Sequence, residues 1–279
     1  MNVTSSTRVL VLLGDPVSHS LSPVIQNAAC AETGVDGVYV AVRCNAGDLE
    51  GFMHGLSRAG GGGNVTIPHK EKAAAVVDVP SDAVRRTGAC NTFWGGEDGR
   101  VHGDNTDVDG FRRALRNFLH GSTSGIRVLL LGAGGAARAT LMGLLEEGAE
   151  EVVILNRSTE RARAVARRIG GQRARVVLLA EEVRDQSFDL VVNATSLGLS
   201  PNDPVPFDFE LPARVGAAMD LVYGPQPTPF MRAAEEYGVR VINGGDMLVQ
   251  QGAVAFERWW GREAPLEAMT RAFQEAMKG

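Results

Sequence analysis

The stretch Arg127-Val-Leu-Leu-Leu-Gly-Ala-Gly-Gly-Ala-Ala-Arg138 decides the fold of much of this chain. Its apolar run, Val128 to Leu131, is short and unbroken, which is typical of a strand buried on both faces of a sheet. Gly132, Gly134 and Ala137 follow in the pattern G-x-G-x-x-G/A, and a helical pattern begins there. The first glycine permits a tight turn, the second lets a pyrophosphate approach the backbone, and the small third residue lets helix and strand pack closely.

This turn is the predicted site of a dinucleotide. The free N–H groups at a helix N-terminus bind phosphates, so the helix after the turn would hold the pyrophosphate. Glycine spacing alone is weak evidence, but a second strand, Val152 to Leu155, follows at the distance expected of a βαβ unit. The residues predicted to line the cofactor at this turn are Gly132, Ala133, Gly134, Gly135 and Ala136.

Further strands alternate with helices or loops after this turn, and this predicts a doubly wound parallel sheet, the Rossmann arrangement. A small-residue loop, Gly121 to Gly125, marks an expected domain edge before it. The N-terminal part of the chain predicts a second α/β domain. The strands of the doubly wound sheet are expected near Val128, Val152, Val176, Leu190 and Met219, with 239–243 as a last strand.

Length and composition exclude several classes of protein. A chain of 279 residues is long enough for two domains, and a net charge of −5 with scattered Lys and Arg argues against a nucleic-acid partner. Cys30, Cys44 and Cys90 are far apart, which favours reduced thiols over a disulfide framework or a zinc site, so no metal is expected. No apolar run is long enough for a bilayer, and no secretory segment opens the chain. We expect a cytoplasmic protein without a membrane partner.

The nucleotide is predicted from the end of the second strand. An NAD site usually has an Asp or Glu there, whereas this strand ends at Asn156-Arg-Ser158. Arg157 could stack beside the adenine and pair with a 2′-phosphate, with Ser158 and Arg161 as further donors. The alternative is that Arg157 and Arg161 are solvated residues at a helix start. The pattern favours NADP.

The first loop contains two serines with different expected tasks. A strand from Arg8 to Leu13 leads into the loop, and a helix follows from Pro23. Ser22 is placed to cap this helix, whereas Ser20 has no such task and is the better candidate for a ligand contact. Farther along, the glycine run 60–63 is interpreted as a flexible surface linker.

Polar residues gather where predicted strands end. Asn64, Thr66 and Lys70 lie at one strand-to-helix junction, and Asp107 lies at a helix start. Polar residues just past strand ends face the binding crevice of an open α/β sheet. A single Lys or Asp there is more often a surface charge, but Lys70 and Asp107 beside a nicotinamide site indicate an acid/base pair. Other polar candidates are Asn91, 193–196 and Gln251.

Six stretches along the chain form ordered motifs: Gly14-Asp-Pro-Val-Ser-His-Ser-Leu-Ser-Pro23, Asn64-Val-Thr-Ile-Pro-His-Lys70, Gly88-Ala-Cys-Asn-Thr92, Asn105-Thr-Asp-Val-Asp-Gly-Phe111, Asp220-Leu-Val-Tyr223 with Thr228-Pro-Phe230, and Gly245-Asp-Met-Leu-Val-Gln-Gln251. Taken together, these motifs resemble those of the shikimate dehydrogenases over nearly the whole chain. Cys90 stands where that family usually has valine. Gly63 stands where a larger residue is usual, and the glycine run would loosen the loop before Asn64.

The resemblance implies NADPH-dependent reduction of 3-dehydroshikimate to shikimate. Lys70 would be the catalytic lysine and Asp107 its partner. The resemblance implies a substrate-binding domain formed by residues 1–112 and 244–279 and an NADP-binding domain formed by residues 113–243. It also implies a monomer or a homodimer. The implied substrate ligands are Ser20, Ser22, Thr66, Asn91, Tyr223 and Gln251, and the further cofactor contacts are Asn156, Thr195, Leu221 and Gly244.

Two alternatives stay open at this point. One is a quinate/shikimate or aminoshikimate dehydrogenase of the same fold; quinate enzymes that prefer NAD are expected to have an acid near 156–158, which this chain lacks. The other is a non-catalytic NADPH-binding sensor, which would not require Lys70 and Asp107 together.

Overall fold

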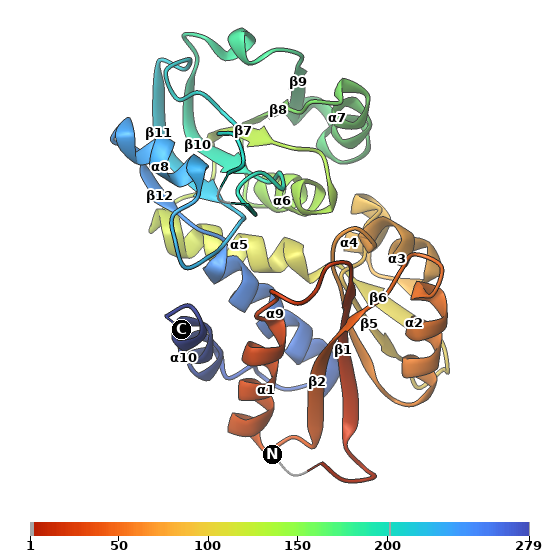
Figure 1. The fold of residues 1–279 in the computed structure, drawn as a ribbon. Helices are drawn as coiled ribbons and strands as arrows, with labels where there is room; N and C mark the ends of the chain where they lie inside the picture. The colour runs from red at the N-terminus through yellow and green to blue at the C-terminus, as the bar shows by residue number, and fades with distance from the viewer. Residues whose placement is uncertain (1–2, 201, 279) are drawn as a thin grey trace. The chain divides into compact units, whose positions relative to one another are not determined.

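The computed structural model describes residues 3–200 and 202–278, which divide into two compact units. The split unit comprises Met1–Gly110 and Leu248–Gly279, and the continuous unit comprises Phe111–Met247. The divisions therefore fall at 110/111 and 247/248, where the sequence led us to expect 112/113 and 243/244. Figure 1 shows the two units with their elements labelled.

The split unit is built on a mixed sheet in the order β2-β1-β3-β5-β6-β4. The first three strands are parallel, whereas β5 pairs antiparallel with both β3 and β6. The strands are β1 Arg8–Gly14, β2 Gly37–Arg43, β3 Gly62–Val65, β4 Val79–Pro80, β5 Thr92–Gly95 and β6 Val101–Asp104. The helices are α1 Ser22–Thr33, α2 Leu49–Arg58, α3 Lys70–Val76, α4 Asp82–Thr87 and α10 Leu266–Ala276, while α5 Thr106–Leu119 and α9 Gly245–Trp260 have residues in both units.

Alternation along β1 divides the core of the split unit between two faces. Leu10 and Leu12 pack with Tyr39 and with Trp259 of α9. Val11 and Leu13 pack on the other face with residues of α2, α3 and α4. Figure 1 shows the same layering, with α1, α9 and α10 on one side of the sheet and α2 and α3 on the other. Because successive side chains of a strand point to opposite faces, one apolar strand supplies both cores.

The glycine run corrects one expectation. Gly62 and Gly63 are buried in β3, between β1 and β5, so the run is not a surface linker and does not loosen the loop before Asn64. A Cβ on Gly63 would lie 2.1 Å from the carbonyl oxygen of Val11, and one on Gly62 would lie 2.4 Å from that of Phe93. Glycine is required there because the neighbouring backbones approach too closely for any side chain.

The continuous unit confirms the predicted doubly wound sheet. All its strands are parallel, in the order β12-β11-β10-β7-β8-β9, which is the 6-5-4-1-2-3 order of a Rossmann fold. The strands are β7 Arg127–Leu131, β8 Glu151–Leu155, β9 Ala174–Val177, β10 Ser187–Asn193, β11 Arg214–Asp220 and β12 Arg240–Ile242. The helices are α6 Gly135–Glu146, α7 Thr159–Val165 and α8 Pro229–Glu236, with short helical turns at Ala166–Gly170, Gly171–Arg173 and Ala180–Val183.

The two faces of this sheet are covered differently. On one face, α5, α6 and α7 pack on the strands in a core that includes Leu115 and Leu141. On the other face, α8 supplies Phe230, and the connection from β10 to β11, which has no helix in its described part, supplies Phe207 and Phe209. The Phe209 and Phe230 rings lie 5.3 Å apart. The connection from β10 to β11 therefore covers this face of the sheet with Phe207 and Phe209 and without a helix in its described part.

Candidate active site

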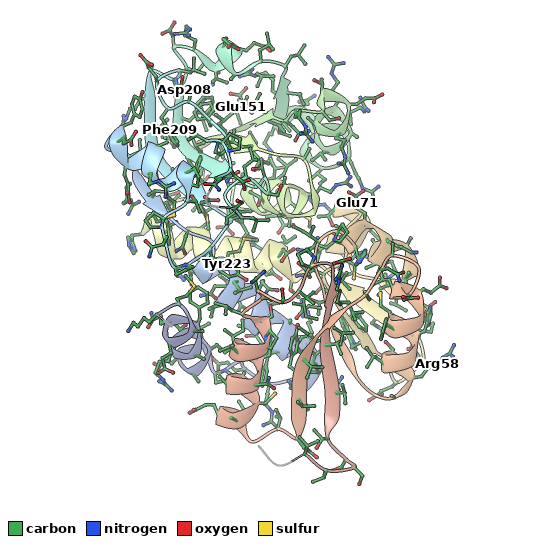
Figure 2. The ribbon with its side chains drawn as sticks, in the orientation of Figure 1. Arg58, Glu71, Glu151, Asp208, Phe209 and Tyr223 are labelled. Carbon is green, nitrogen blue, oxygen red and sulfur yellow. The ribbon has the colours of Figure 1, made fainter. Side chains whose placement is uncertain are left out.

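The predicted acid/base pair forms a direct ion pair. Lys70 is the first residue of α3, and Asp107 is the second residue of α5. Lys70 Nζ lies 2.6 Å from Asp107 Oδ2, and the two side chains are only 15% and 7% exposed. Figure 2 labels Glu71, the neighbour of Lys70, and so locates this junction. Because water has little access, the attraction between the ammonium and the carboxylate is weakly screened.

The backbone of Lys70 is held as firmly as its side chain. Its carbonyl oxygen accepts a 2.8 Å hydrogen bond from the N–H of Cys90, in the segment that leads into β5. Cys90 replaces the valine expected from the resemblance, and its thiol is fully buried and lies 3.2 Å from the carbonyl oxygen of Thr92. Burial raises the pKa of Cys90 to about 12. The thiol is therefore a small core group and not a nucleophile.

Asn91 joins the ion pair to a second predicted substrate ligand. Its amide nitrogen donates to Asp107 Oδ1 at 2.9 Å and lies 3.3 Å from Gln251 Oε1. A Cβ on Gly110 would lie 2.5 Å from Gln251 Cβ, so this glycine lets α9 approach α5 closely enough for the contact. Sequence reasoning gave Gly110 no role, although its place in the Asn105–Phe111 motif was a signal. Lys70, Asp107, Asn91 and Gln251 are thus brought together.

The structure corrects the structural tasks expected of the two loop serines. The helix α1 begins at Ser22, and its N-cap is Leu21, without a side-chain cap. Ser22 therefore does not cap the helix, because the helix starts one residue earlier than expected. Instead, the hydroxyl of Ser20 accepts from the N–H of Ser22 at 3.2 Å, and the two hydroxyls lie 3.2 Å apart. The prediction that Ser20 has no structural task was wrong.

Thr66 lies at the end of β3, on the segment that leads to Lys70. Its N–H donates to the carbonyl oxygen of Leu13 at 2.8 Å, which ties it to the end of β1. A Cβ on Gly14 would lie 2.3 Å from Thr66 Cγ2, so Gly14 provides the room for this side chain. The half-exposed Thr66 hydroxyl makes no hydrogen bond with a described residue and is available to a ligand.

In the continuous unit, the predicted phosphate turn lies at the switch in strand order between β7 and β10. Gly132 has a φ of +110°, and a Cβ there would lie 2.9 Å from the carbonyl oxygen of Ala194. Gly134 is the N-cap of α6, and a Cβ there would meet nothing within 4 Å. The first glycine is thus required by the fold, whereas the second leaves open space at a helix N-terminus. This arrangement fits a bound pyrophosphate.

The segment after β8 has the geometry expected of a nucleotide-selecting turn. Asn156 donates through its side chain to the carbonyl oxygen of Ser158 at 2.8 Å, and Ser158 caps α7. Arg157 between them is exposed. Arg161 is also exposed, in the first turn of α7. The turn is therefore held by Asn156 and Ser158, and it leaves the Arg157 guanidinium at the surface.

The remaining predicted cofactor contacts lie beyond β10 and β11. The hydroxyl and N–H of Thr195 donate to Asn193 Oδ1 at 2.7 and 3.1 Å. The N–H of Leu221 donates to the carbonyl oxygen of Asn193 at 2.9 Å. A Cβ on Gly244 would lie 2.1 Å from the carbonyl oxygen of Leu221. Tyr223, labelled in Figure 2, follows on the same segment of the continuous unit and is half-buried.

A buried carboxylate that the sequence left without a role organises these segments. Asp220 has no solvent exposure and accepts from the Thr228 hydroxyl at 2.5 Å, from Asn193 Nδ2 at 2.9 Å and from the N–H of Val222 at 3.0 Å. Burial raises the pKa of Asp220 to about 6, although the three hydrogen bonds favour the ionised form. The carboxylate joins the ends of β10 and β11 to the start of α8.

Within residues 3–200 and 202–278, no group of three or more His, Cys, Asp or Glu side chains is placed to bind a metal ion. In the same ranges, no helix is both long and apolar enough to cross a membrane.

Three family models match successive parts of the chain. They describe a shikimate dehydrogenase substrate binding domain at residues 12–93, a shikimate / quinate 5-dehydrogenase at 114–199 and a shikimate 5'-dehydrogenase C-terminal domain at 244–272. A shikimate dehydrogenase (NADP(+)) of Moorella thermoacetica is 42% identical over 99% of this chain and 96% of its own length. The chain belongs to the shikimate dehydrogenase family.

Solved structures of the shikimate dehydrogenase family share the whole fold. The shikimate dehydrogenase of Aquifex aeolicus has a TM-score of 0.88 at 34% identity and covers 97% of this chain and 99% of its own. The enzyme of Thermus thermophilus, solved in complex with NADP(H) and shikimate, has a TM-score of 0.85 at 39% identity, covering 96% of this chain and 99% of its own. The likeness to the family therefore spans both units.

Proposed function

We propose that this chain catalyses the reversible, NADPH-dependent reduction of 3-dehydroshikimate to shikimate, in the cytoplasmic biosynthesis of aromatic amino acids. The observation that carries this assignment is the buried 2.6 Å pair of Lys70 and Asp107, which Asn91 ties to Gln251, in a chain 42% identical to an NADP-dependent shikimate dehydrogenase. A sensor that only bound NADPH would have no use for this pair.

Lys70 acts on the oxygen of the ketone. NADPH supplies the hydride when it is bound, and the ketone oxygen gains negative charge as the hydride arrives. The Lys70 ammonium stabilises that charge and donates the proton that completes the alcohol. Asp107 positions the ammonium through its 2.6 Å contact. Positioned proton transfer of this kind contributes about 10²- to 10⁴-fold to the rate. In the reverse direction, the same amine takes the proton from the shikimate hydroxyl.

Neutral donors and acceptors in the split unit select the substrate. Asn91, Thr66 and Gln251 would bind the ring hydroxyls, since their polar groups lie at or beside the Lys70–Asp107 pair or are open to a ligand. Ser20 and Ser22 would hold the carboxylate through hydroxyls that lie 3.2 Å apart. Tyr223 is the further carboxylate ligand that the family resemblance implies. A site built to pair with hydroxyls discriminates strongly against analogues that lack them.

The continuous unit would hold NADP through its backbone and one turn. The N–H groups at the start of α6, after Gly132 and Gly134, would bind the pyrophosphate. Arg157 would pair with the 2′-phosphate, because it is exposed and no acid stands at the end of β8. The remaining contacts on this unit are assigned to Ala133, Gly135, Ala136, Asn156, Ser158, Arg161, Thr195, Leu221 and Gly244.

The test is an NADPH-oxidation assay of the purified chain with 3-dehydroshikimate, run in reverse with shikimate, quinate and aminoshikimate and with NADP and NAD. We expect turnover of 3-dehydroshikimate and shikimate with the phosphorylated cofactor. A preference for quinate, for aminoshikimate or for NAD would replace the assigned substrate or cofactor within the family. Binding of NADPH with no turnover of any of these substrates would contradict the assignment of an enzyme.

A further inference from the structure

Behind the Lys70–Asp107 pair lies a chain of buried polar side chains that the proposed mechanism does not use. The hydroxyl of Tyr39 lies 2.8 Å from Asn64 Oδ1, and Asn64 Nδ2 lies 2.9 Å from the hydroxyl of Thr92. That hydroxyl lies 3.0 Å from Asn91 Oδ1, and Asn91 Nδ2 lies 2.9 Å from Asp107 Oδ1. All five residues are at most 5% exposed, so water does not compete with these contacts.

Three groups with fixed roles set the direction of the chain. The carbonyl oxygen of Asn91 can only accept, and it lies 3.0 Å from the Asn64 side-chain nitrogen. The Asn64 oxygen must therefore face Tyr39, whose hydroxyl is the donor. The N–H of Thr106 can only donate, and it lies 2.7 Å from Asn91 Oδ1. The Asn91 nitrogen must then face the Asp107 carboxylate, which can only accept.

The hydroxyl of Thr92 completes the sequence of donors. It accepts from Asn64 Nδ2, so its single hydrogen is directed onward to Asn91 Oδ1 or to the Thr106 hydroxyl at 2.9 Å. When this hydrogen is directed to Asn91 Oδ1, every bond from Tyr39 to Asp107 has its donor on the side away from the carboxylate. Bonds aligned in this way polarise one another and strengthen together in a buried environment.

The first member of the chain is itself held at several points. The backbone of Tyr39 exchanges two hydrogen bonds with the side chain of Asn27, at 2.8 and 2.9 Å. Its ring lies 5.9 Å from that of Trp259 on α9. Burial keeps the pKa of Tyr39 well above its usual value, so the hydroxyl stays protonated and donates.

We propose that Tyr39, Asn64 and Thr92 are positioning residues that act together with the N–H of Thr106 to hold Asn91, and through it the Lys70–Asp107 pair. If Asn91 reversed its amide, its oxygen would face the Asp107 carboxylate and its nitrogen would face the Thr106 N–H. Both contacts would be repulsive. The proposal rests on the proposed function only in that its main readout is turnover of 3-dehydroshikimate.

The test removes one hydroxyl group at a time and compares each variant with a matched substitution elsewhere in the protein. Tyr39→Phe deletes the first donor, and Thr92→Val deletes the central hydroxyl, whereas Thr92→Ser keeps it. The controls are Tyr237→Phe, which removes an exposed hydroxyl, and Thr140→Val, which removes a buried hydroxyl without a partner among the described residues. For each variant, kcat and KM for 3-dehydroshikimate are measured across pH, together with the melting temperature.

We expect Tyr39→Phe and Thr92→Val to lower kcat/KM by about tenfold, the effect of one unsatisfied buried group. The shape of the profile of kcat/KM against pH should change in both, because Asn91 no longer holds the Lys70–Asp107 pair in the same geometry. Thr92→Ser should restore the wild-type profile, and both controls should match it. A mere loss of stability would lower the active fraction without changing the shape of the profile.

Unchanged pH profiles in Tyr39→Phe and Thr92→Val, with the controls also unchanged, would overturn the positioning role while leaving the proposed function intact. If Thr92→Val does not fold, Tyr39→Phe and Thr92→Ser decide the question by the same profiles. If the wild-type protein does not turn over the substrate, the proposed function fails. The coupling between the hydrogen-bonded side chains is then tested by melting temperature alone. The losses of melting temperature from Tyr39→Phe and Thr92→Val should then be less than additive in the double variant. Additive losses would overturn the positioning role.

Discussion

Around Asp107 in the split unit, the polar atoms are held by other side chains: Lys70 and Asn91 bind its two oxygens, and Gln251 lies beside Asn91. Around Gly132 in the continuous unit, the groups prepared for a ligand are main-chain N–H groups at the start of α6. The region around Asp107 requires particular polar side chains, whereas the region around Gly132 requires positions that have no side chain. Substitutions should therefore fail in the split unit when a polar atom is lost and in the continuous unit when a Cβ is added.

The largest expected effect is on the ion pair. Lys70→Ala should lower kcat by about 10²- to 10⁴-fold, because the developing alkoxide loses its proton donor. The KM for 3-dehydroshikimate should change far less. Lys72→Ala is the matched control, since Lys72 is exposed in the same helix and its ammonium bonds, among the described residues, only to the carbonyl oxygen of Ala46. Steady-state NADPH oxidation measures both, and an unchanged kcat would remove Lys70 from the mechanism.

The next effect separates the two glycines of the phosphate turn. Gly132→Ala should lose about 1–3 kcal/mol of unfolding free energy, since alanine is strained at a φ of +110° and its Cβ would lie 2.9 Å from the Ala194 oxygen. Gly134→Ala should lose much less stability, because its Cβ meets nothing within 4 Å. Both should weaken NADPH binding. Urea unfolding and NADPH titration distinguish them, and equal stability losses would contradict the contrast.

A smaller effect tests the selection of the phosphorylated cofactor by Arg157. Arg157→Ala should raise the KM for NADPH by about tenfold, the worth of one charge-assisted hydrogen bond near water, and leave the KM for NADH unchanged. Arg163→Ala, at an exposed position of α7, should change neither. Equal losses for the two cofactors would mean that Arg157 binds the adenine and not the 2′-phosphate.

The smallest effect concerns the buried carboxylate of Asp220. Because burial raises its pKa to about 6, its contribution to stability is full below the ordinary value of 3.8 and is lost as pH rises through about 6. Between pH 7 and pH 5 the free energy of unfolding should therefore rise by about 1 kcal/mol from this group. Asp220→Asn should abolish this increment, as shown by the difference between wild-type and variant urea curves at the two pH values. An identical pH dependence in both proteins would exclude Asp220 as its source.

The sequence was most informative where structure is local. The glycine pattern after Val128–Leu131 and the spacing of the later apolar runs predicted a doubly wound sheet, since each signal lies within one strand–turn–helix unit. The ion pair is different in kind. Lys70 and Asp107 are 37 residues apart, so their types and positions suggested an acid/base pair, but only folding brings them to 2.6 Å.

The predictions that were wrong or missing depend on the folded structure and not on the neighbouring sequence. The glycine run at 60–63 looked flexible because glycine usually is, but its role depends on the backbones of Val11 and Phe93. The capping task expected of Ser22 was wrong because α1 begins one residue early. No local signal marked Tyr39 as a partner of Asn64, since an apolar strand position and a loop motif meet only in the folded sheet.

The split unit takes its residues from both ends of the chain, and this has a consequence for synthesis on the ribosome. The continuous unit, Phe111–Met247, emerges as one uninterrupted segment, whereas Gln251 and its close neighbour Gly110 cannot meet until the final helices have left the exit tunnel. We expect nascent chains arrested before Leu248 to resist protease across the Rossmann sheet and to be cut readily near β1, and equal resistance in both regions would contradict this order. The Rossmann sheet would thus be formed in a cell before the split unit is complete.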